Sequence, residues 1–392
     1  WDPIHPLLAD VLDETFGIMV YQEDVSRAAV SPAGFSHAEA DGLRKVMSKK
    51  DRERALKDFY EQFHEGARKR GVSEEKIKEI WAMMMSFSGY SFCKPHSASY
   101  ARVSFQAAYL KVHHSAEFMA AVISNQGGFY STFAYVSEAR RMGLTVQPPD
   151  VRSSRIRWTG KGDILQVGLM SIKDLSIRTM TRIVDEQNRW LFTYMDDFLD
   201  RVRPDEAEGR ALIHAGALDR LCSGSSRAML LWDLARWKKT HAKEKRSPSL
   251  FGHDPLPAAP SLPPEREIDR LRREFAALGF LCDRHPITLY QSYLTGRRIV
   301  KAVHLSRYLN RQATMVGWLI TGKQVRTKHG EPMEFLTFED DTGLMETTFF
   351  PKTYHRYCHM IDSGRPYLLT GKVEQDWGVC TLNVGKLVPL KR

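Results

Sequence analysis

The sequence has no long apolar run and only five cysteines. No uninterrupted apolar stretch among its 392 residues approaches the roughly 20 residues that a membrane span needs. Residues 1–5 carry neither the basic region nor the apolar core of a secretory signal. The cysteines are scattered and form no Cys-x-x-Cys pair, which argues against a disulfide framework and a zinc ribbon. These absences predict a cytoplasmic protein with no membrane partner.

Length and charge narrow the class further. At roughly 150 residues per domain, the chain is long enough for two or three domains. Its 43% hydrophobic and 27% charged content excludes wholesale disorder. Lys plus Arg number 57 against 47 Asp plus Glu, and the net charge of +10 favours a polyanionic partner, most simply nucleic acid. Because the chain has no initiator Met, we expect a processed chain or a piece of a longer protein.

The residue patterns predict a largely helical first two-thirds. Apolar residues recur at helical spacing over residues 56–67 and 77–84, and a longer helix is expected from near Ser97 until two glycines follow Gln126. Residues 156–169 favour a strand pair. Six of the 18 prolines fall in residues 247–264, which indicates a linker.

The last hundred residues change to strand-like runs separated by turn residues. These runs are residues 314–321, 333–339, 344–350, 367–373 and 379–384. A helical segment lies between the third and fourth runs, as in an oligonucleotide-binding (OB) barrel. The predicted fold is therefore multidomain and mostly α-helical, followed by a C-terminal five-stranded OB β-barrel.

Basic residues at two places are candidates for phosphate binding. Lys94 and His96 follow a Gly-bearing loop and lead into a helix, whose unpaired N–H groups and dipole favour an anion. Arg44 and Lys45 would point away from the apolar face of another helix. The alternative for both places is a solvated surface, with Ser97 merely capping its helix.

Segments containing these residues resemble the fingers of bacterial DNA polymerase III alpha subunits, the C-family replicative polymerases. The matching segments are residues 17–25, 43–50 and 87–110. The resemblance continues in the family's order through nearly the whole chain and ends in the barrel with residues 330–333, 338–343 and 350–351. It implies a C-terminal portion of the subunit, with fingers, a clamp-binding domain and an OB domain.

In that family the fingers supply basic residues to the triphosphate of the incoming deoxynucleotide (dNTP). The resemblance implies that role for Arg44 and Lys45, which fall on a paired basic position. It implies the same for Lys94, His96 and Tyr100, which fall on the family's Lys, His and Tyr. The chain departs from the family pattern beside them: Cys93 replaces an Asn, and Ser48 and Ser91 replace glycines.

The chain has no match to the family's catalytic carboxylates. Nucleotidyl transfer needs clustered acids that hold two metal ions about 4 Å apart. The pairs Asp196-Asp197 and Asp340-Asp341 are expected in turns, with diverging side chains. We therefore expect no catalytic residue and no cofactor in this chain, although the parent enzyme would use Mg²⁺. Magnesium-dependent primer extension by the chain alone would contradict this.

The middle region resembles the family's clamp-binding domain with its helix-hairpin-helix motif. Such hairpins usually carry glycines whose amides bind a DNA phosphate. Asp174 and Ser176 stand at the glycine positions of the first hairpin, and the negative Asp174 opposes a phosphate, which favours a structural role. A second hairpin-like run keeps Gly216.

The Pro-rich linker contains a Leu-Phe pair, Leu250-Phe251. Its place matches the family's motif for the sliding clamp, although Ser247 stands where Gln is expected. Two apolar anchors on a short disordered segment suit a pocket on a partner. The alternative is an ordinary linker with a buried Leu-Phe pair.

The barrel is expected to bind single-stranded DNA through aromatic and basic side chains. The basic candidates are Arg297, Arg298, Lys301, Arg326 and Lys328. The aromatic candidates, some of which must fill the core, are Trp318, Phe335, Phe338, Phe349 and Trp377. His355, Cys358 and His359 lie at metal-like spacing but lack a fourth ligand, so no metal site is expected.

The resemblance implies a finger domain over residues 1–145, a clamp-binding domain over 146–295 with the linker at 247–264, and an OB domain over 296–392. The expected partners are primer–template and single-stranded DNA, dNTP, the sliding clamp and other replicase subunits. The alternative function is a free-standing, non-catalytic single-stranded DNA-binding protein built from OB and hairpin modules.

Overall fold

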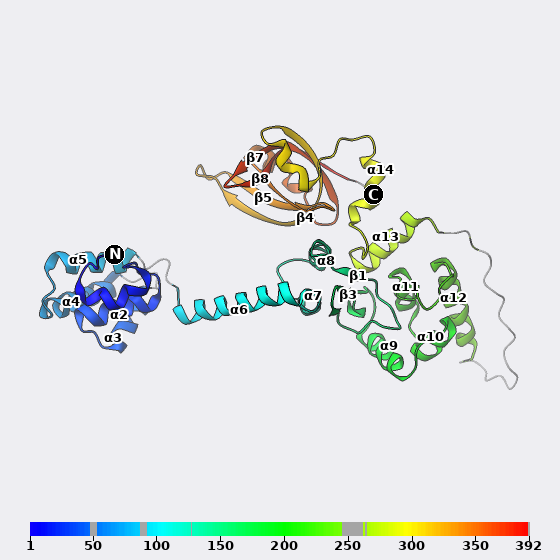
Figure 1. Cartoon of the computed structure of the whole chain (residues 1–392), viewed down its shortest axis with the longest axis horizontal. Helices are drawn as coiled ribbons and strands as arrows, with labels where there is room; N and C mark the ends of the chain where they lie inside the picture. Colours follow the sequence, from blue (N-terminus) through cyan, green and yellow to red (C-terminus); the bar gives the residue numbers. More distant parts are fainter. Residues whose placement is uncertain (48–52, 87–91, 127, 245–261, 263–264, 391–392) are drawn as a thin grey trace. The chain divides into compact units, whose positions relative to one another are not determined.

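The computed structural model describes residues 1–47, 53–86, 92–126, 128–244, 262 and 265–390. The chain forms two compact units, residues 1–109 and 110–392 (Figure 1). Within the described part of the chain, no helix is long and apolar enough to cross a membrane.

The first unit is helical, as the sequence predicts. Its elements are η1 (Pro6–Leu8), α1 (Ala9–Leu12), η2 (Asp13–Thr15), α2 (Gln22–Ala33), α3 (His37–Met47), α4 (Glu53–Lys69), α5 (Glu74–Ser86) and the larger part of α6 (Lys94–His113). Helices α2 and α4 cross closely at Gly66, where an added Cβ would lie 1.9 Å from the carbonyl oxygen of Ala33. This approach brings Leu43, Phe63 and Ile77 into one core, in which all three are fully buried.

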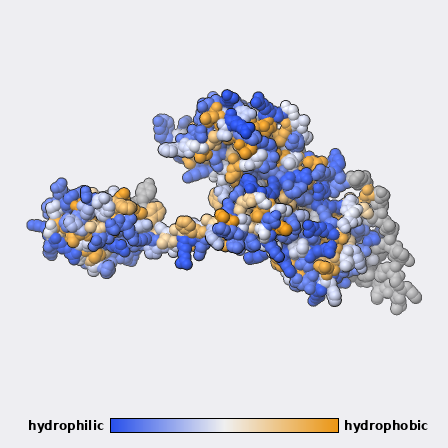
Figure 2. All heavy atoms as spheres, viewed as in Figure 1, coloured by the Kyte–Doolittle hydropathy of each residue, from blue (hydrophilic) through white to orange (hydrophobic). Residues whose placement is uncertain are grey.

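Helix α6 begins three residues earlier than predicted, at Lys94 rather than near Ser97. Pro95 lies in its first turn, where the fixed φ of proline suits a helix. Ser97 is therefore not a cap, and its hydroxyl donates to the carbonyl oxygen of Cys93 (3.0 Å). The helix ends at His113, so the expected long helix is divided before α7. Its apolar residues, such as Val103 and Phe105, are exposed (Figure 2).

The second unit begins with a mixed helical domain. Its elements are α7 (Ser115–Asn125), α8 (Thr132–Arg141), β1 (Thr145–Gln147), β2 (Thr159–Lys161), β3 (Ile164–Gln166), η4 (Leu169–Ser171), α9 (Ile177–Arg189), α10 (Met195–Val202), α11 (Glu206–His214), α12 (Arg227–Glu244) and α13 (Glu267–Leu278). The predicted strand pair is confirmed as antiparallel β2 and β3, and β1, which was not predicted, pairs in parallel with β3.

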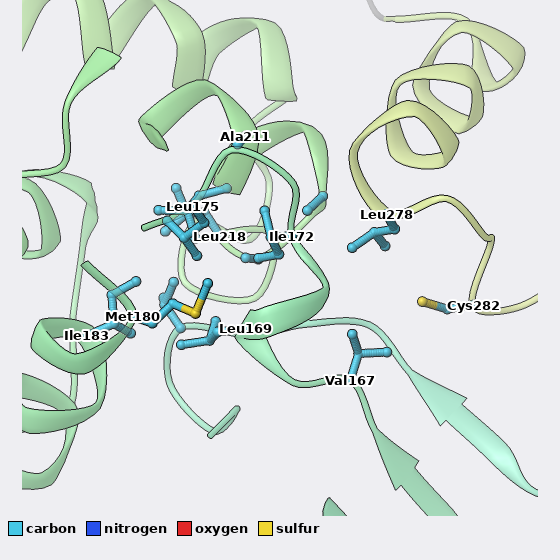
Figure 3. Close-up of a cluster of buried hydrophobic side chains, with 14 of the residues drawn as sticks. Val167, Leu169, Ile172, Leu175, Met180, Ile183, Ala211, Leu218, Leu278 and Cys282 are labelled. Atoms are coloured by element: carbon cyan, nitrogen blue, oxygen red, sulfur yellow. The ribbon is translucent and has the colours of Figure 1, made fainter. Parts of the chain in front are cut away.

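One core joins the elements of this domain. Figure 3 shows its buried side chains gathered from both hairpin regions, including Ile172, Leu175 and Leu218. Helices α7 and α8 contribute Met119 and Val136 to the same core. The domain boundary that the resemblance implies, after residue 145, stays a prediction.

The predicted five-stranded barrel is confirmed, and it is closed. After η5 (Pro286–Tyr290), α14 (Gln291–Leu294) and η6 (Ala302–Tyr308), the strands are β4 (Gln312–Arg326), β5 (Pro332–Glu339), β6 (Leu344–Phe349), β7 (Pro366–Asp376) and β8 (Val379–Pro389). Their order is β4-β5-β6-β8-β7, with β7 returning to β4. The helical segment between the third and fourth strands is α15 (Pro351–Tyr357) followed by η7 (Cys358–Met360).

A buried carboxylate joins the barrel to the helical domain within this unit. Glu339, at the end of β5, has no exposed surface. It accepts hydrogen bonds from Ser137 Oγ (2.7 Å) and Arg141 Nη1 (3.1 Å) of α8. His285 Nδ1 accepts from the Ile287 amide, which leaves Nε2 to donate to Glu339 (3.1 Å). These three donors therefore come from outside the barrel.

Candidate nucleotide and nucleic-acid sites

Three segments that are far apart in the sequence meet in the first unit. The start of α2 lies beside the chain that leads into α6, because the Gln22 amide donates to the Phe92 carbonyl (2.7 Å). Arg44 Nη1 of α3 donates to Gln22 Oε1 (2.9 Å). The Nζ of Lys94 lies 5.5 Å from the centre of the Tyr21 ring. Arg44 therefore contacts Gln22 and Lys94 lies beside Tyr21, although 50 residues separate the two cations.

Carboxylates engage these cations. Asp41 pairs with Arg44 (2.7 Å) and with Lys45 (2.8 Å). Glu14 of η2 pairs with the Lys94 ammonium. The predicted paired basic positions thus share one acid on α3, and Lys94 takes another from a different element.

A carboxylate also accepts a hydrogen bond from the backbone amide at the start of α6. Glu23 Oε2 accepts from the Lys94 N–H (3.0 Å). Burial raises the pKa of Glu23, but hydrogen bonds, first that from the Lys94 amide and also one from Cys93, outweigh burial and hold this pKa below its ordinary value. The Cys that replaces the family's Asn therefore contacts Glu23. Ser48 and Ser91 lie outside the described residues.

His96 and Tyr100 lie one helical turn apart on α6. Their ring centres are 4.5 Å apart in an edge-to-face arrangement. Tyr100 is 64% exposed and so offers its ring and hydroxyl to solvent. Of the predicted nucleotide residues, the structure thus connects Arg44, Lys45 and Lys94 to the same group of segments, and pairs His96 with Tyr100.

The two predicted hairpins differ from each other at their glycine positions. Asp174 adopts a left-handed backbone (φ 62°), the conformation that a glycine at this place would favour. Ser176 caps α9, and its amide donates to Glu208 Oε1 (3.2 Å). The second hairpin keeps its glycine at φ 80°, and a Cβ on Gly216 would lie 2.3 Å from the buried guanidinium of Arg227.

Glu208 is buried and fully hydrogen-bonded. Its Oε1 also accepts from Ser176 Oγ (2.5 Å), and its Oε2 accepts from Thr179 Oγ1 (2.8 Å) and the Asp205 amide (3.0 Å). Burial raises the pKa of Glu208, but these hydrogen bonds outweigh it and leave the pKa below its ordinary value. The carboxylate thus accepts hydrogen bonds from the starts of both α9 and α11. The Ser176 amide is therefore already hydrogen-bonded within the protein.

Two turns of the barrel expose groups suited to single-stranded nucleic acid. Trp377 and Gly378 form the β7–β8 turn, both with positive φ (49° and 84°), and Trp377 is 97% exposed. The β4–β5 turn carries Arg326, whose Nη1 donates to the Gly330 carbonyl (3.3 Å), and the exposed Lys328. OB folds bind oligonucleotides through these loops and through the second and third strands.

The second strand of the barrel presents the other exposed aromatic candidate. Phe335 of β5 is 44% exposed, with Lys323 of β4 and Thr348 of β6 as its cross-strand neighbours. Across the next strands, Thr348 pairs with Asn383 of β8, and Asn383 pairs with Lys372 of β7. The remaining aromatic candidates, Trp318, Phe338 and Phe349, are buried and fill cores.

The basic segment before the barrel approaches a different turn. Lys301 pairs with Asp341 of the β5–β6 turn. Arg297 donates from Nε to the Tyr293 carbonyl (3.1 Å), and both Arg297 and Arg298 are exposed. Leu250 and Phe251 lie outside the described residues.

The adjacent acidic pairs do not fit a two-metal site. Asp196 pairs with Arg236 (3.1 Å), and Asp197 accepts from the Thr193 amide (3.0 Å). They lie in the first turn of α10, so the predicted turn is wrong there. Asp340 accepts from the Thr342 amide (2.7 Å) and Asp341 pairs with Lys301. Among the residues that the structure describes, no three His, Cys, Asp or Glu side chains are placed to hold a metal ion.

Comparison with known proteins covers each part of the chain. Residues 1–71 match the bacterial DNA polymerase III alpha subunit finger domain, residues 143–230 a helix-hairpin-helix motif, and residues 313–390 an OB-fold nucleic acid binding domain. The DNA polymerase III subunit alpha of Thermus aquaticus is 33% identical over 94% of this chain. The chain belongs to the DNA polymerase III alpha-subunit family. It spans 31% of the length of that relative.

Other alpha subunits match over a similar range. That of Saccharopolyspora erythraea is 30% identical over 99% of the chain, which covers 35% of its own length. That of Aquifex aeolicus is 31% identical over 95% of the chain and 31% of its own length. Among solved structures, a domain of replication protein A from Methanococcus maripaludis matches 24% of the chain and 98% of its own, with 18% identity and a TM-score of 0.21.

Two acidic residues of this alpha-subunit region were not predicted from the sequence. Glu208 had a local signal, because Asp205 and Glu208 have the spacing of a capping box. Glu14 had none, since its contact with Lys94 joins residues 80 positions apart. The sequence shows where charged residues lie along the chain, but only the fold shows which acidic side chains contact which donors.

Proposed function

We propose that this chain is the substrate-binding part of a DNA-directed DNA polymerase for bacterial DNA replication. The first unit binds the triphosphate of an incoming dNTP, and the second binds primer–template and single-stranded DNA. The observation that carries the proposal is that Arg44 and Lys94 contact two consecutive residues, Gln22 and Tyr21. Two cations from different elements form a suitable cradle for a chain of phosphates.

The proposal leaves the metal-holding carboxylates to another part of the enzyme. In the family they belong to a palm domain, and the parent reaction would use Mg²⁺ there. This chain would bind and orient substrates in the cytoplasm as one component of a larger replicase. By itself it is proposed to incorporate no nucleotide.

Titration with dATP tests the nucleotide site. We expect Lys94→Ala and Arg44→Ala each to weaken dATP binding by about 10- to 150-fold, because hydrogen bonds to charged groups contribute about 1.5–3 kcal/mol. Lys69→Ala is the charge-matched control, since Lys69 pairs with Glu65 on α4 (2.7 Å). Isothermal titration calorimetry on the full chain measures all three affinities.

The same titration separates the proposal from the alternative. A free-standing single-stranded DNA-binding protein would bind oligonucleotides but would need no triphosphate site. Equal dATP affinities for wild type, Lys94→Ala and Lys69→Ala would favour that alternative. The similarity to alpha subunits over at least 94% of the chain supports the polymerase.

We also propose that Leu250 and Phe251 bind the sliding clamp. The apolar pair lies in a Pro-rich segment at the place of the family's clamp motif. Replacing both residues by Ala should abolish capture of the chain on immobilised clamp, because the two anchors would supply most of the binding. Replacing Leu256 and Leu262, which lie in the same Pro-rich segment, is the control. Unchanged capture by the Leu250/Phe251 variant would exclude this motif.

A further inference from the structure

We propose that Glu14 is a displaceable counter-ion of the triphosphate site, which holds Lys94 until a phosphate replaces it. The inference rests on the proposed nucleotide function and adds a residue that competes with the substrate. It starts from the ion pair between the Glu14 carboxylate and the Lys94 ammonium. Both groups belong to the first unit, and the pair links η2 to the first residue of α6.

The carboxylates around Lys94 differ in how firmly they are held. Glu23 accepts the Lys94 amide hydrogen and lies partly buried in the first turn of α2. It therefore fixes the start of α6 as an N-terminal acid does. The side chain of Glu14 is 68% exposed, and among the described residues Lys94 is its hydrogen-bond partner. Glu14 can thus swing into solvent without leaving a buried donor unpaired.

Charge balance gives a reason for the displacement. The cations Arg27, Arg44, Lys45 and Lys94 are matched by the acids Glu14, Glu23, Asp24 and Asp41, so these eight groups sum to zero. The hydrogen bond and the charge of Lys94 hold the pKa of Glu14 below its ordinary value, with a smaller contribution from Arg27. A triphosphate gains more from these cations if the exposed Glu14 carboxylate leaves.

When no nucleotide is bound, the ion pair with Glu14 restricts the Lys94 side chain. Lys94 on a flexible stem would otherwise sample many rotamers, and the pair with Glu14 keeps it beside the Tyr21 ring. Glu14 thus orients Lys94 before binding and lowers the affinity for triphosphate. Because exposed ion pairs are worth little, the effect on affinity should be modest.

The test is a double-mutant cycle measured with dATP and with inorganic tripolyphosphate. Glu14→Gln should tighten binding of both by about two- to fivefold at low salt, and the gain should shrink at high salt. Glu65→Gln removes the same charge from an exposed pair on α4 and should change little. In a Lys94→Ala background, the gain from Glu14→Gln should fall to that of Glu65→Gln, because Glu14 acts mainly through Lys94.

Three results would overturn the inference. Equal gains from Glu14→Gln and Glu65→Gln would show a general charge effect, and a gain that persists in full without Lys94 would remove the proposed contact. Either result, with Lys94→Ala still weakening binding, would leave the nucleotide function intact. No binding by wild type or by Glu14→Gln would overturn both proposals.

Discussion

Trp377→Ala should weaken binding of a single-stranded oligonucleotide by about 5- to 150-fold, the equivalent of one lost base stack of about 1–3 kcal/mol. The indole is 97% exposed, so the folded chain gains almost nothing from burying it. Its backbone is left-handed (φ 49°) at a turn position that usually holds Asn, Asp or Gly. An exposed aromatic held in a strained conformation favours a role in binding over one in folding.

Fluorescence anisotropy with a labelled oligo-dT measures this effect. Trp190→Ala is the matched control, because Trp190 is 78% exposed but lies between α9 and α10, outside the barrel. Lys328→Ala should instead make the negative slope of log affinity against log salt shallower by about 0.7, as for one lost phosphate contact on a single strand. Equal effects of the two Trp variants would exclude the β7–β8 turn as a stacking site.

Glu208→Ala should destabilise the hairpin domain by about 2–4 kcal/mol, since the substitution removes a capping box and leaves buried donors unpaired. The carboxylate accepts hydrogen bonds from Ser176, Thr179 and Asp205, so its loss uncouples the starts of α9 and α11. Glu206→Ala is the control, because Glu206 is exposed on the same helix and pairs with Arg210 at 3.5 Å. Hydrogen exchange of peptides around residues 170–180 reports this domain separately from the rest of the chain.

The contribution of Glu208 should also depend on pH. Its folded-state pKa is lowered, so the carboxylate stabilises the fold fully above its unfolded pKa of about 4.3. This stabilisation is lost as the pH falls through the lower folded value. The difference in exchange protection between wild type and Glu208→Gln should therefore shrink below about pH 4. A difference that is constant down to pH 2 would contradict the proposed ionised state.

The barrel could be predicted from the sequence because its information is local. Each strand run is bounded by turn residues such as Asp376 and Gly378, and the helix after the third strand fixes the order of an OB fold. The exposure of each aromatic side chain could not be predicted in this way, because it depends on packing between distant segments. Trp318 is buried because η5 and α13 cover its side of the barrel, where it packs with Tyr290 and Phe275. Trp377 has no such cover.

The finger residues could be identified from the sequence only through their resemblance to a family. Helical spacing indicates where Arg44 and Lys94 lie on their helices, but their meeting at Tyr21 and Gln22 depends on packing among α2, α3 and α6. The predicted start of α6 is wrong because Ser97 is a typical cap residue, whereas Pro95 favours the first turn of a helix and so places the start at Lys94. Glu23, which accepts the Lys94 amide hydrogen, lies 71 residues away in the chain.

If this chain recognises phosphate chains through charge, as we propose, its affinity for oligonucleotides must fall as the salt concentration rises. If the five predicted cations from Arg297 to Lys328 each contact a phosphate, log affinity should fall with log salt at a slope of about −3.5. Between 50 and 200 mM salt the affinity for oligo-dT should therefore fall by about 100-fold. An affinity that stays constant over this range would contradict the account.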